Sequence, residues 1–129
     1  MQEKRLRKEK YLIEELQKYK MVNVQGKLSS DIVILCWGSN KGVCFEAAGI
    51  LGLKAIQPVV LQPFPLQQFK EALGMPKRIF CVENNSSGQL ALLLRQYGIQ
   101  IDNKILKYDG RPFSLDELVE RLKSESSNP

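Results

Sequence analysis

Short apolar runs alternate with helical patterns along most of this chain. The continuous apolar run Asp31–Trp37 is typical of a strand that is buried on both faces. Val43, Ala47, Ile50 and Leu51 then follow at helical spacing. The same unit recurs, with strands predicted at 54–61, 78–82 and 104–108 and helices that begin near Leu66, Leu90 and Ser114. An alternating run, Met21–Gln25, predicts a short edge strand before the first unit.

This alternation predicts an α/β fold, a three-layer α/β/α sandwich around a mainly parallel sheet. Parallel neighbours need crossover connections, which are right-handed and place helices on both faces. Loops that leave parallel strands gather at one edge of the sheet, here called the C-terminal rim. The rim is formed by Gly38–Gly42, Gln62–Pro65, Glu83–Gly88 and Asp109–Phe113. Because all four loops are polar and rich in Gly or Pro, the functional surface is expected there.

The densest polar segment of the rim is Glu83–Leu90, which joins an apolar strand to a helix. Asn, Ser and Gly at a helix start offer donors to a polar ligand, because the first turn has unpaired N–H groups and a partial positive charge. The structural alternative is that Ser86-x-x-Gln89 is a capping box.

The segment Gly38–Gly42 has the strand-before, helix-after context of a phosphate-binding turn. It lacks the spacing of a Walker A loop and the Gly-x-Gly-x-x-Gly of dinucleotide-binding proteins. A tight turn capped by Ser39 or Asn40 explains the same residues without a ligand.

Asp109-Gly110-Arg111-Pro112 places a carboxylate and a guanidinium on either side of a glycine. One hypothesis is a rigid turn with a local ion pair. The other is ligand binding, because the Arg111 guanidinium is the group in the rim loops best suited to bind an anion or a carboxylate through two parallel hydrogen bonds.

Composition is typical of one compact domain, with 129 residues of which 43% are hydrophobic and 26% charged. No apolar run is long enough to span a bilayer, and the charged start of the chain does not resemble a signal peptide. A cytoplasmic location without membrane contact is therefore expected.

Three cysteines lie far apart in the sequence, without a Cys-x-x-Cys pair, and the chain contains no histidine. This spacing suits neither a zinc site nor an iron–sulfur cluster, so no metal is expected in this chain. Cys36 and Cys81 lie in apolar strands and are interpreted as buried, reduced thiols. Without His, the commonest general base is absent. On its own, the chain is a poor candidate for an enzyme.

The net charge of +5 is concentrated at the start, where residues 1–20 hold seven Lys/Arg and four Glu. Leu12, Ile13, Leu16 and Tyr19 mark an amphipathic helix there. Three hypotheses are a docking or linking element, a solvated arm, and a nucleic-acid contact. Docking is preferred, because basic residues without interleaved surface aromatics are a weak nucleic-acid signal. The helix is expected to be detached from the domain or to form a homodimer with a second copy.

Four ordered motifs together resemble the C-terminal domain of the α subunit of 2-oxoacid:ferredoxin oxidoreductases. They are Trp37-Gly38-Ser39, Leu61-Gln62-Pro63-Phe64-Pro65, Glu83-Asn84-Asn85 with Gly88-Gln89-Leu90, and Lys107-Tyr108-Asp109-Gly110-Arg111-Pro112-Phe113. The resemblance covers about residues 20–123. Residues 1–19 resemble the connector from the preceding domain, and 124–129 are expected to be a frayed tail.

The resemblance implies a transketolase C-terminal-like fold, with a mixed five-stranded sheet whose first, edge strand runs antiparallel. It also implies an enzyme that decarboxylates a 2-oxoacid on thiamine diphosphate, with Mg, and passes electrons through iron–sulfur clusters to ferredoxin, forming an acyl-CoA. The family's pyrimidine-binding-type domain and its β subunit are not in this sequence, so the isolated chain is expected to be inactive.

No catalytic role is assigned to Glu83, which is expected to organise the Asn84-Asn85 loop. The remaining α-subunit domain and the β subunit are the implied partners, with ferredoxin and CoA at the level of the complex. The candidate interface residues, some of them near the cofactor or CoA approach, are Gly38, Ser39, Asn84, Asn85, Gly88, Gln89, Asp109 and Arg111. A free-standing small-anion or nucleotide-binding module is the alternative, because fold alone does not fix function.

Overall fold

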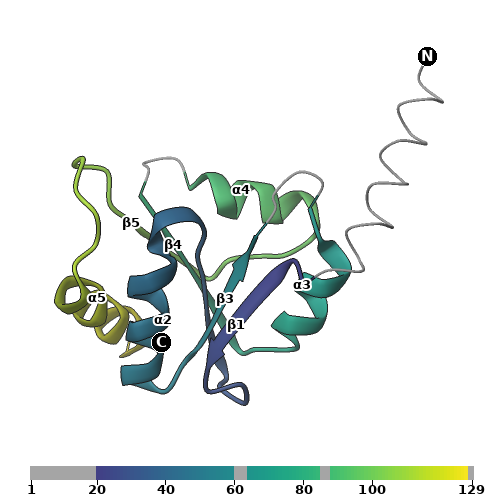
Figure 1. Ribbon diagram of the computed structural model, residues 1–129, viewed down its shortest axis with the longest axis horizontal. Coiled ribbons are helices and arrows are strands. Elements are labelled where there is room, and N and C mark those ends of the chain that lie inside the picture. Colours follow the sequence, from purple (N-terminus) through teal and green to yellow (C-terminus); the bar gives the residue numbers. More distant parts are fainter. Residues whose placement is uncertain (1–19, 60–63, 85–87, 128–129) are drawn as a thin grey trace.

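The computed structural model describes residues 20–59, 64–84 and 88–127 (Figure 1). The strands are β1 (Val22–Gly26), β2 (Ile32–Leu35), β3 (Lys54–Pro58), β4 (Arg78–Glu83) and β5 (Asn103–Leu106). The helices are η1 (Gly38–Asn40), α2 (Lys41–Leu51), α3 (Leu66–Leu73), α4 (Gln89–Gln96) and α5 (Leu115–Ser127). These elements match the predicted order, and their ends differ from the predicted ones by a few residues.

The five strands form one mixed sheet in the order β1-β3-β2-β4-β5. Strand β2 pairs in parallel with both β3 and β4, and β4 pairs in parallel with β5. Strand β1 pairs with β3 antiparallel, in a register that joins Val22 to Pro58 and Gly26 to Lys54. The expected antiparallel edge strand is therefore confirmed.

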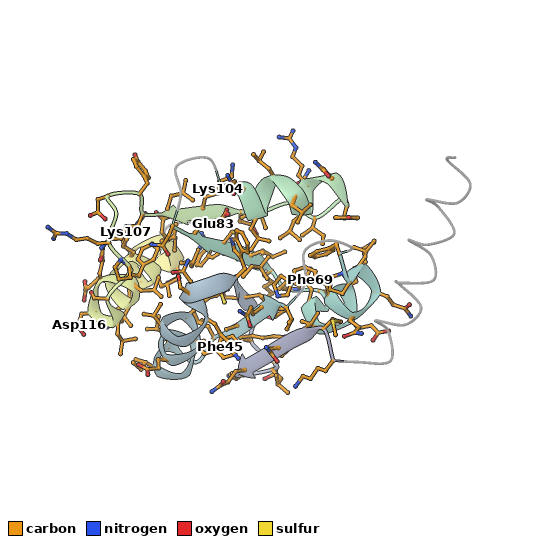
Figure 2. All side chains as sticks on the ribbon, turned by 45° about the horizontal axis from the view of Figure 1, so that its top comes forward. Phe45, Phe69, Glu83, Lys104, Lys107 and Asp116 are labelled. Carbon is orange, nitrogen blue, oxygen red and sulfur yellow. The ribbon has the colours of Figure 1, made fainter. Side chains whose placement is uncertain are left out.

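Helices cover both faces of the sheet, α2 and α5 on one and α3 and α4 on the other (Figure 1). Fully buried Phe80 belongs to the core beneath α2 and α5. Fully buried Phe69 belongs to the core beneath α3 and α4 (Figure 2). Both cores exist because continuous apolar strands supply side chains to each face. The three-layer α/β/α sandwich of the transketolase C-terminal-like type is confirmed.

The C-terminal helix is longer than the sequence pattern predicts. A frayed tail was expected from residue 124, but α5 continues to Ser127. The Arg78 guanidinium donates to the backbone oxygens of Glu125, at 3.0 Å, and Ser126, at 3.2 Å. The Asn103 amide donates to the Glu125 carboxylate at 2.7 Å. These contacts with β4 and β5 hold the last turn of α5, so the expected tail is wrong as far as Ser127.

The predicted N-terminal helix, residues 1–19, lies outside the described residues, so its docking, dimer and arm hypotheses stay predictions. Among the helices that the structure describes, none combines the length and apolar character needed to cross a bilayer.

Candidate functional site

The strand order creates a switch point between β2 and β4. From β2 the chain passes through α2 to β3 on one side, and from β4 it passes through α4 to β5 on the other. Ligands of open α/β sheets bind where such connections diverge, beyond the carboxyl ends of the strands. Because β2 to β5 are parallel, the loops that follow them meet at one edge, as the C-terminal rim prediction requires. Within the rim, residues 60–63 and 85–87 lie outside the described part of the chain.

The loop after β2 turns directly into a helix. Gly38, with φ of +65°, adopts a left-handed conformation that favours glycine. Helix η1 then runs into α2, and the Lys41 N–H donates to the Gly38 oxygen. Asn40 precedes α2 but no side-chain hydrogen bond caps the helix entrance, and η1 also has no side-chain cap. The predicted cap by Ser39 or Asn40 is therefore wrong.

The loop after β4 is anchored by Glu83, the last residue of the strand (Figure 2). Its fully buried carboxylate accepts hydrogen bonds from the backbone N–H groups of Leu90, at 2.5 Å, and Ala91, at 3.3 Å. The Cys81 thiol also donates to this carboxylate, at 3.5 Å. A carboxylate is favourable here, because the helix N-terminus carries partial positive charge. Glu83 therefore caps α4 from the preceding strand.

Helix α4 begins at Gln89, with Gly88 as its N-cap. Asn85 and Ser86 lie outside the described residues, so the Ser86-x-x-Gln89 capping box and the expected role of Glu83 in organising the Asn84-Asn85 loop stay predictions. The described contacts of Glu83 with backbone N–H groups are those that cap α4. Gly88 has a φ of +64°, and an added Cβ would lie 3.2 Å from Cδ of Lys104 and 3.4 Å from Oε2 of Glu83.

The loops after β4 and β5 are joined by Asn84. Its side-chain amide donates to the backbone oxygen of Arg111 at 3.3 Å. The Asp109 carboxylate accepts from the backbone N–H of Arg111 at 3.0 Å, which makes the loop a rigid turn. The predicted ion pair is not found, because no carboxylate of the described residues pairs with the Arg111 guanidinium.

The base of the β5 loop is held by charged side chains around a buried ring. Lys107 forms an ion pair with Glu117, and the Arg121 guanidinium donates to the Leu106 oxygen at 2.7 Å. Both cations lie over the Phe113 ring, 5.8 Å and 5.7 Å from its centroid. The Ser114 hydroxyl accepts from the Glu117 N–H at 3.2 Å and so caps this helix, whose start near Ser114 was predicted. Exposed residues 108–112 therefore project from a fixed base.

The structure places the predicted site residues at several points along the rim. Gly38 and Ser39 are exposed before α2, Asn84 is exposed after β4, and Gln89 is exposed at the start of α4. Gly88 is buried, Asp109 and Arg111 are exposed after β5, and Asn85 lies outside the described residues. Asn84 and Arg111 are brought together by a direct hydrogen bond. Asn40, which the sequence suggests only as a possible cap of the turn after β2, is buried.

All three cysteines are buried and free, as predicted for Cys36 and Cys81. A hydrogen bond with Cys36, followed by burial, raises the pKa of the Cys44 thiol. Burial, followed by the charge of Glu83, raises the pKa of the Cys81 thiol. These two thiols stay protonated, whereas metal ligation requires a thiolate. No group of three or more His, Cys, Asp or Glu suited to a metal occurs in ranges 20–59, 64–84 and 88–127.

The fold and the rim define a doubly wound α/β domain with a polar switch point. No protein-family model matches the sequence. The chain is 35% identical over 130 residues to the 2-oxoacid:ferredoxin oxidoreductase subunit alpha of Saccharolobus solfataricus, covering 96% of this chain and 21% of that protein. It is 34% identical over 125 residues to the alpha subunit of 2-oxoacid:ferredoxin oxidoreductase 1 of Sulfurisphaera tokodaii, covering 95% and 20%. The chain thus spans about a fifth of the length of the curated relatives it matches.

Two solved structures extend the comparison. The 2-oxoglutarate:ferredoxin oxidoreductase of Magnetococcus marinus superposes with a TM-score of 0.75 at 30% identity, over 85% of this chain and 20% of that one. The alpha chain of a probable 2-oxoacid ferredoxin oxidoreductase from Thermoplasma acidophilum gives a TM-score of 0.55 at 31% identity, over 81% of this chain and 96% of that one. The chain belongs to the family of 2-oxoacid:ferredoxin oxidoreductase alpha subunits, as its motifs predicted.

Proposed function

We propose that this chain is a non-catalytic domain of the alpha subunit in a thiamine-diphosphate-dependent 2-oxoacid:ferredoxin oxidoreductase. The assembled enzyme would oxidatively decarboxylate a 2-oxoacid to an acyl-CoA with ferredoxin as acceptor. The observation that carries the proposal is 35% identity over 96% of this chain to one fifth of such a subunit. The Magnetococcus marinus enzyme, whose structure holds 2-oxoglutarate, coenzyme A and succinyl-CoA, supports the acyl-CoA product. Family membership favours this role over a free-standing small-anion-binding module.

The residues that the structure describes do not fit the cofactors of such an enzyme. The described residues lack a metal-binding cluster, and Cys44 and Cys81 are buried thiols with raised pKa values. Glu83 is fully buried and its carboxylate caps α4, so it has no free face for a cofactor. We therefore infer that thiamine diphosphate, Mg and the iron–sulfur clusters are held by the remaining alpha-subunit domain and the beta subunit.

The rim supports a role in subunit contact. Tyr108 is 70% exposed, and Arg111 is exposed in the same loop, which is fixed at its base by Lys107 and Arg121. Exposed aromatic and arginine side chains on a rigid support are typical of interface anchors. We infer that the rim contacts the remaining alpha-subunit domain or the beta subunit, near the approach to the cofactor or CoA.

The isolated chain is expected to show no 2-oxoacid oxidation, because the residues that the structure describes do not fit the cofactors. The assay uses pyruvate, 2-oxoglutarate and branched 2-oxoacids with CoA, thiamine diphosphate, Mg and a viologen acceptor. The complete Saccharolobus solfataricus enzyme serves as the positive control. Reduction of viologen above background by the chain alone would contradict the proposed role.

Replacing Arg111 by alanine is expected to weaken assembly about tenfold, since buried arginines are frequent interface hot spots. Its free energy of unfolding should change by no more than about 0.5 kcal/mol, because the side chain is exposed. Binding is measured by calorimetric titration against the purified remainder of the enzyme, and stability by urea denaturation. Arg95→Ala is the matched control, because Arg95 is also exposed but lies in the last turn of α4. If the two variants bind the remainder of the enzyme equally well, the rim is not part of the interface.

A further inference from the structure

We propose that strand β1 binds β1 of a second copy of this chain, joining two sheets edge to edge across a two-fold axis at Gln25. Strand β1 is an edge of the sheet, because it pairs only with β3. This contact joins two copies of the chain, so it differs from the contact between the rim and the remainder of the enzyme. The rim lies at the carboxyl ends of the parallel strands, whereas this surface lies along β1.

The backbone of β1 has hydrogen-bonding groups on its outer side. Alternate residues of an antiparallel strand bond to the same neighbour. The Lys27 N–H donates to the Leu53 oxygen at 2.9 Å, just after the strand. Gln25 therefore also bonds to β3, whereas the N–H and C=O groups of Val24 and Gly26 lie on the outer side. Within the described part of the chain, these outer groups have no hydrogen-bond partner.

The second half of this edge is the open part. At the start of β1, Val22 is only 5% exposed, and the preceding Met21 N–H donates to the Gln68 side chain of α3 at 2.8 Å. Gln25 and Gly26, in contrast, are exposed. A further strand can therefore pair with the second half of β1.

The other edge of the sheet, β5, is protected against such pairing. Natural edge strands avoid association through charged side chains, proline or bulges. Strand β5 carries exposed Lys104, and its Leu106 oxygen accepts from the Arg121 guanidinium at 2.7 Å. Strand β1 has no charged residue and no proline, and its register with β3 is continuous, without a bulge. Two β1 strands therefore form a closed pair, rather than an open chain of copies joined β1 to β5.

A two-fold axis at Gln25 satisfies the open backbone groups. It places Val24 opposite Gly26 of the second copy, and each such pair exchanges two hydrogen bonds. Gln25 then faces Gln25 of the second copy in a non-hydrogen-bonded pair, with Cα atoms about 4.5 Å apart. Lys27 faces Asn23 of the second copy, so no like charges lie directly opposite each other. The open part of β1 is thus complementary to itself.

Exposed apolar residues lie at the same end of β1. Leu28 is 67% exposed and Ile50 is 61% exposed. A Cβ built on Gly26 would lie 3.4 Å from the Cβ of Ala48, which places the last turns of α2 beside the open end of β1. The two-fold axis brings these ends of the two copies together. Because a pair of short strands alone is marginal in water, burial of this apolar surface supports the contact.

The first test follows self-association of the ¹⁵N-labelled full chain. Sedimentation velocity over a concentration series should show a monomer–dimer equilibrium. Hydrogen exchange of the Val24 and Gly26 amides should slow about tenfold as the dimer fills, while the Asn23 and Gln25 amides, already bonded to β3, should not change. A monomer at every concentration overturns the assignment. So does a dimer that leaves the Val24 and Gly26 amides unprotected, or protection that appears only when the remainder of the enzyme is added.

The second test places charges at the two-fold axis. Gln25→Lys and Gln25→Glu should each weaken dimerisation about tenfold, because two like charges then face each other. An equimolar mixture of the two variants should dimerise again, because opposite charges face each other. The side chain is exposed, so the fold should be retained. Gln96→Lys, at the exposed end of α4, is the matched control and should dimerise as the unaltered chain does. Unchanged dimerisation of Gln25→Lys, or a mixture no stronger than either variant alone, overturns the assignment.

Discussion

Replacing Glu83 by alanine is expected to lower the free energy of unfolding by about 3 kcal/mol, because two buried N–H groups lose their acceptor and each unsatisfied group costs about 1–3 kcal/mol. Those donors are the backbone N–H groups of Leu90 and Ala91, and the lost carboxylate is fully buried. Glu83→Gln retains one acceptor but turns an amide donor toward the helix, so it should cost about 2 kcal/mol. Urea denaturation measures both values.

The control for this change is Glu120→Gln, which removes one negative charge from an exposed position on α5. Its free energy of unfolding should change by no more than about 0.5 kcal/mol. Hydrogen exchange of the Leu90 and Ala91 amides should accelerate in the Glu83 variants alone. If Glu83→Ala is as stable as the control, the carboxylate does not hold α4 in place.

Arg78→Met is expected to lower the free energy of unfolding by about 2 kcal/mol, because charge-assisted hydrogen bonds to partly buried oxygens are lost. The Arg78 guanidinium bonds the Glu125 and Ser126 backbone oxygens and the Asn103 amide oxygen, and it lies over the Phe80 ring. Methionine preserves most of the apolar contact with Phe80, so the loss reports on the polar anchor. Urea denaturation gives the global value.

The effect of losing this anchor should be largest at the end of α5. Hydrogen exchange near residues 122–126 should accelerate more than exchange in α2, because the last turn of α5 is released first. Lys77→Met is the control: Lys77 adjoins Arg78, yet its side chain is 80% exposed and pairs only with Asp31 in the described structure. A uniform change of exchange across the domain would show that Arg78 supports the core rather than the end of α5.

The order of elements and the layers were predictable because the strands are continuous apolar runs and each helix carries an apolar stripe. The end of α5 was not predictable, because polar residues 124–127 give no helical signal by themselves. Their helix is held by Arg78 and Asn103, which lie more than 20 residues away in sequence. A local sequence pattern cannot predict contacts between residues so far apart in the chain.

The location of the rim was likewise predictable, since loops after parallel strands must share an edge. The roles of individual side chains were less so. Glu83 belongs to a strand and reaches α4 across seven positions, whereas sequence rules for caps look only three residues ahead. Asp109 and Arg111 suggested an ion pair, but the carboxylate bonds the backbone and leaves the guanidinium exposed.

The insertion of β3 between β1 and β2 constrains the order in which the sheet can form during synthesis. Strands β1 and β2 come first in the chain but are not neighbours, and each bonds to β3. A nascent chain that ends before Lys54 therefore has no strand pair to form, and the first native pairing waits until β3 has left the ribosome. Strands β4 and β5 are then added in turn at the side of β2. Because this first pairing is non-local, β1 and β2 remain unpaired until β3 is available.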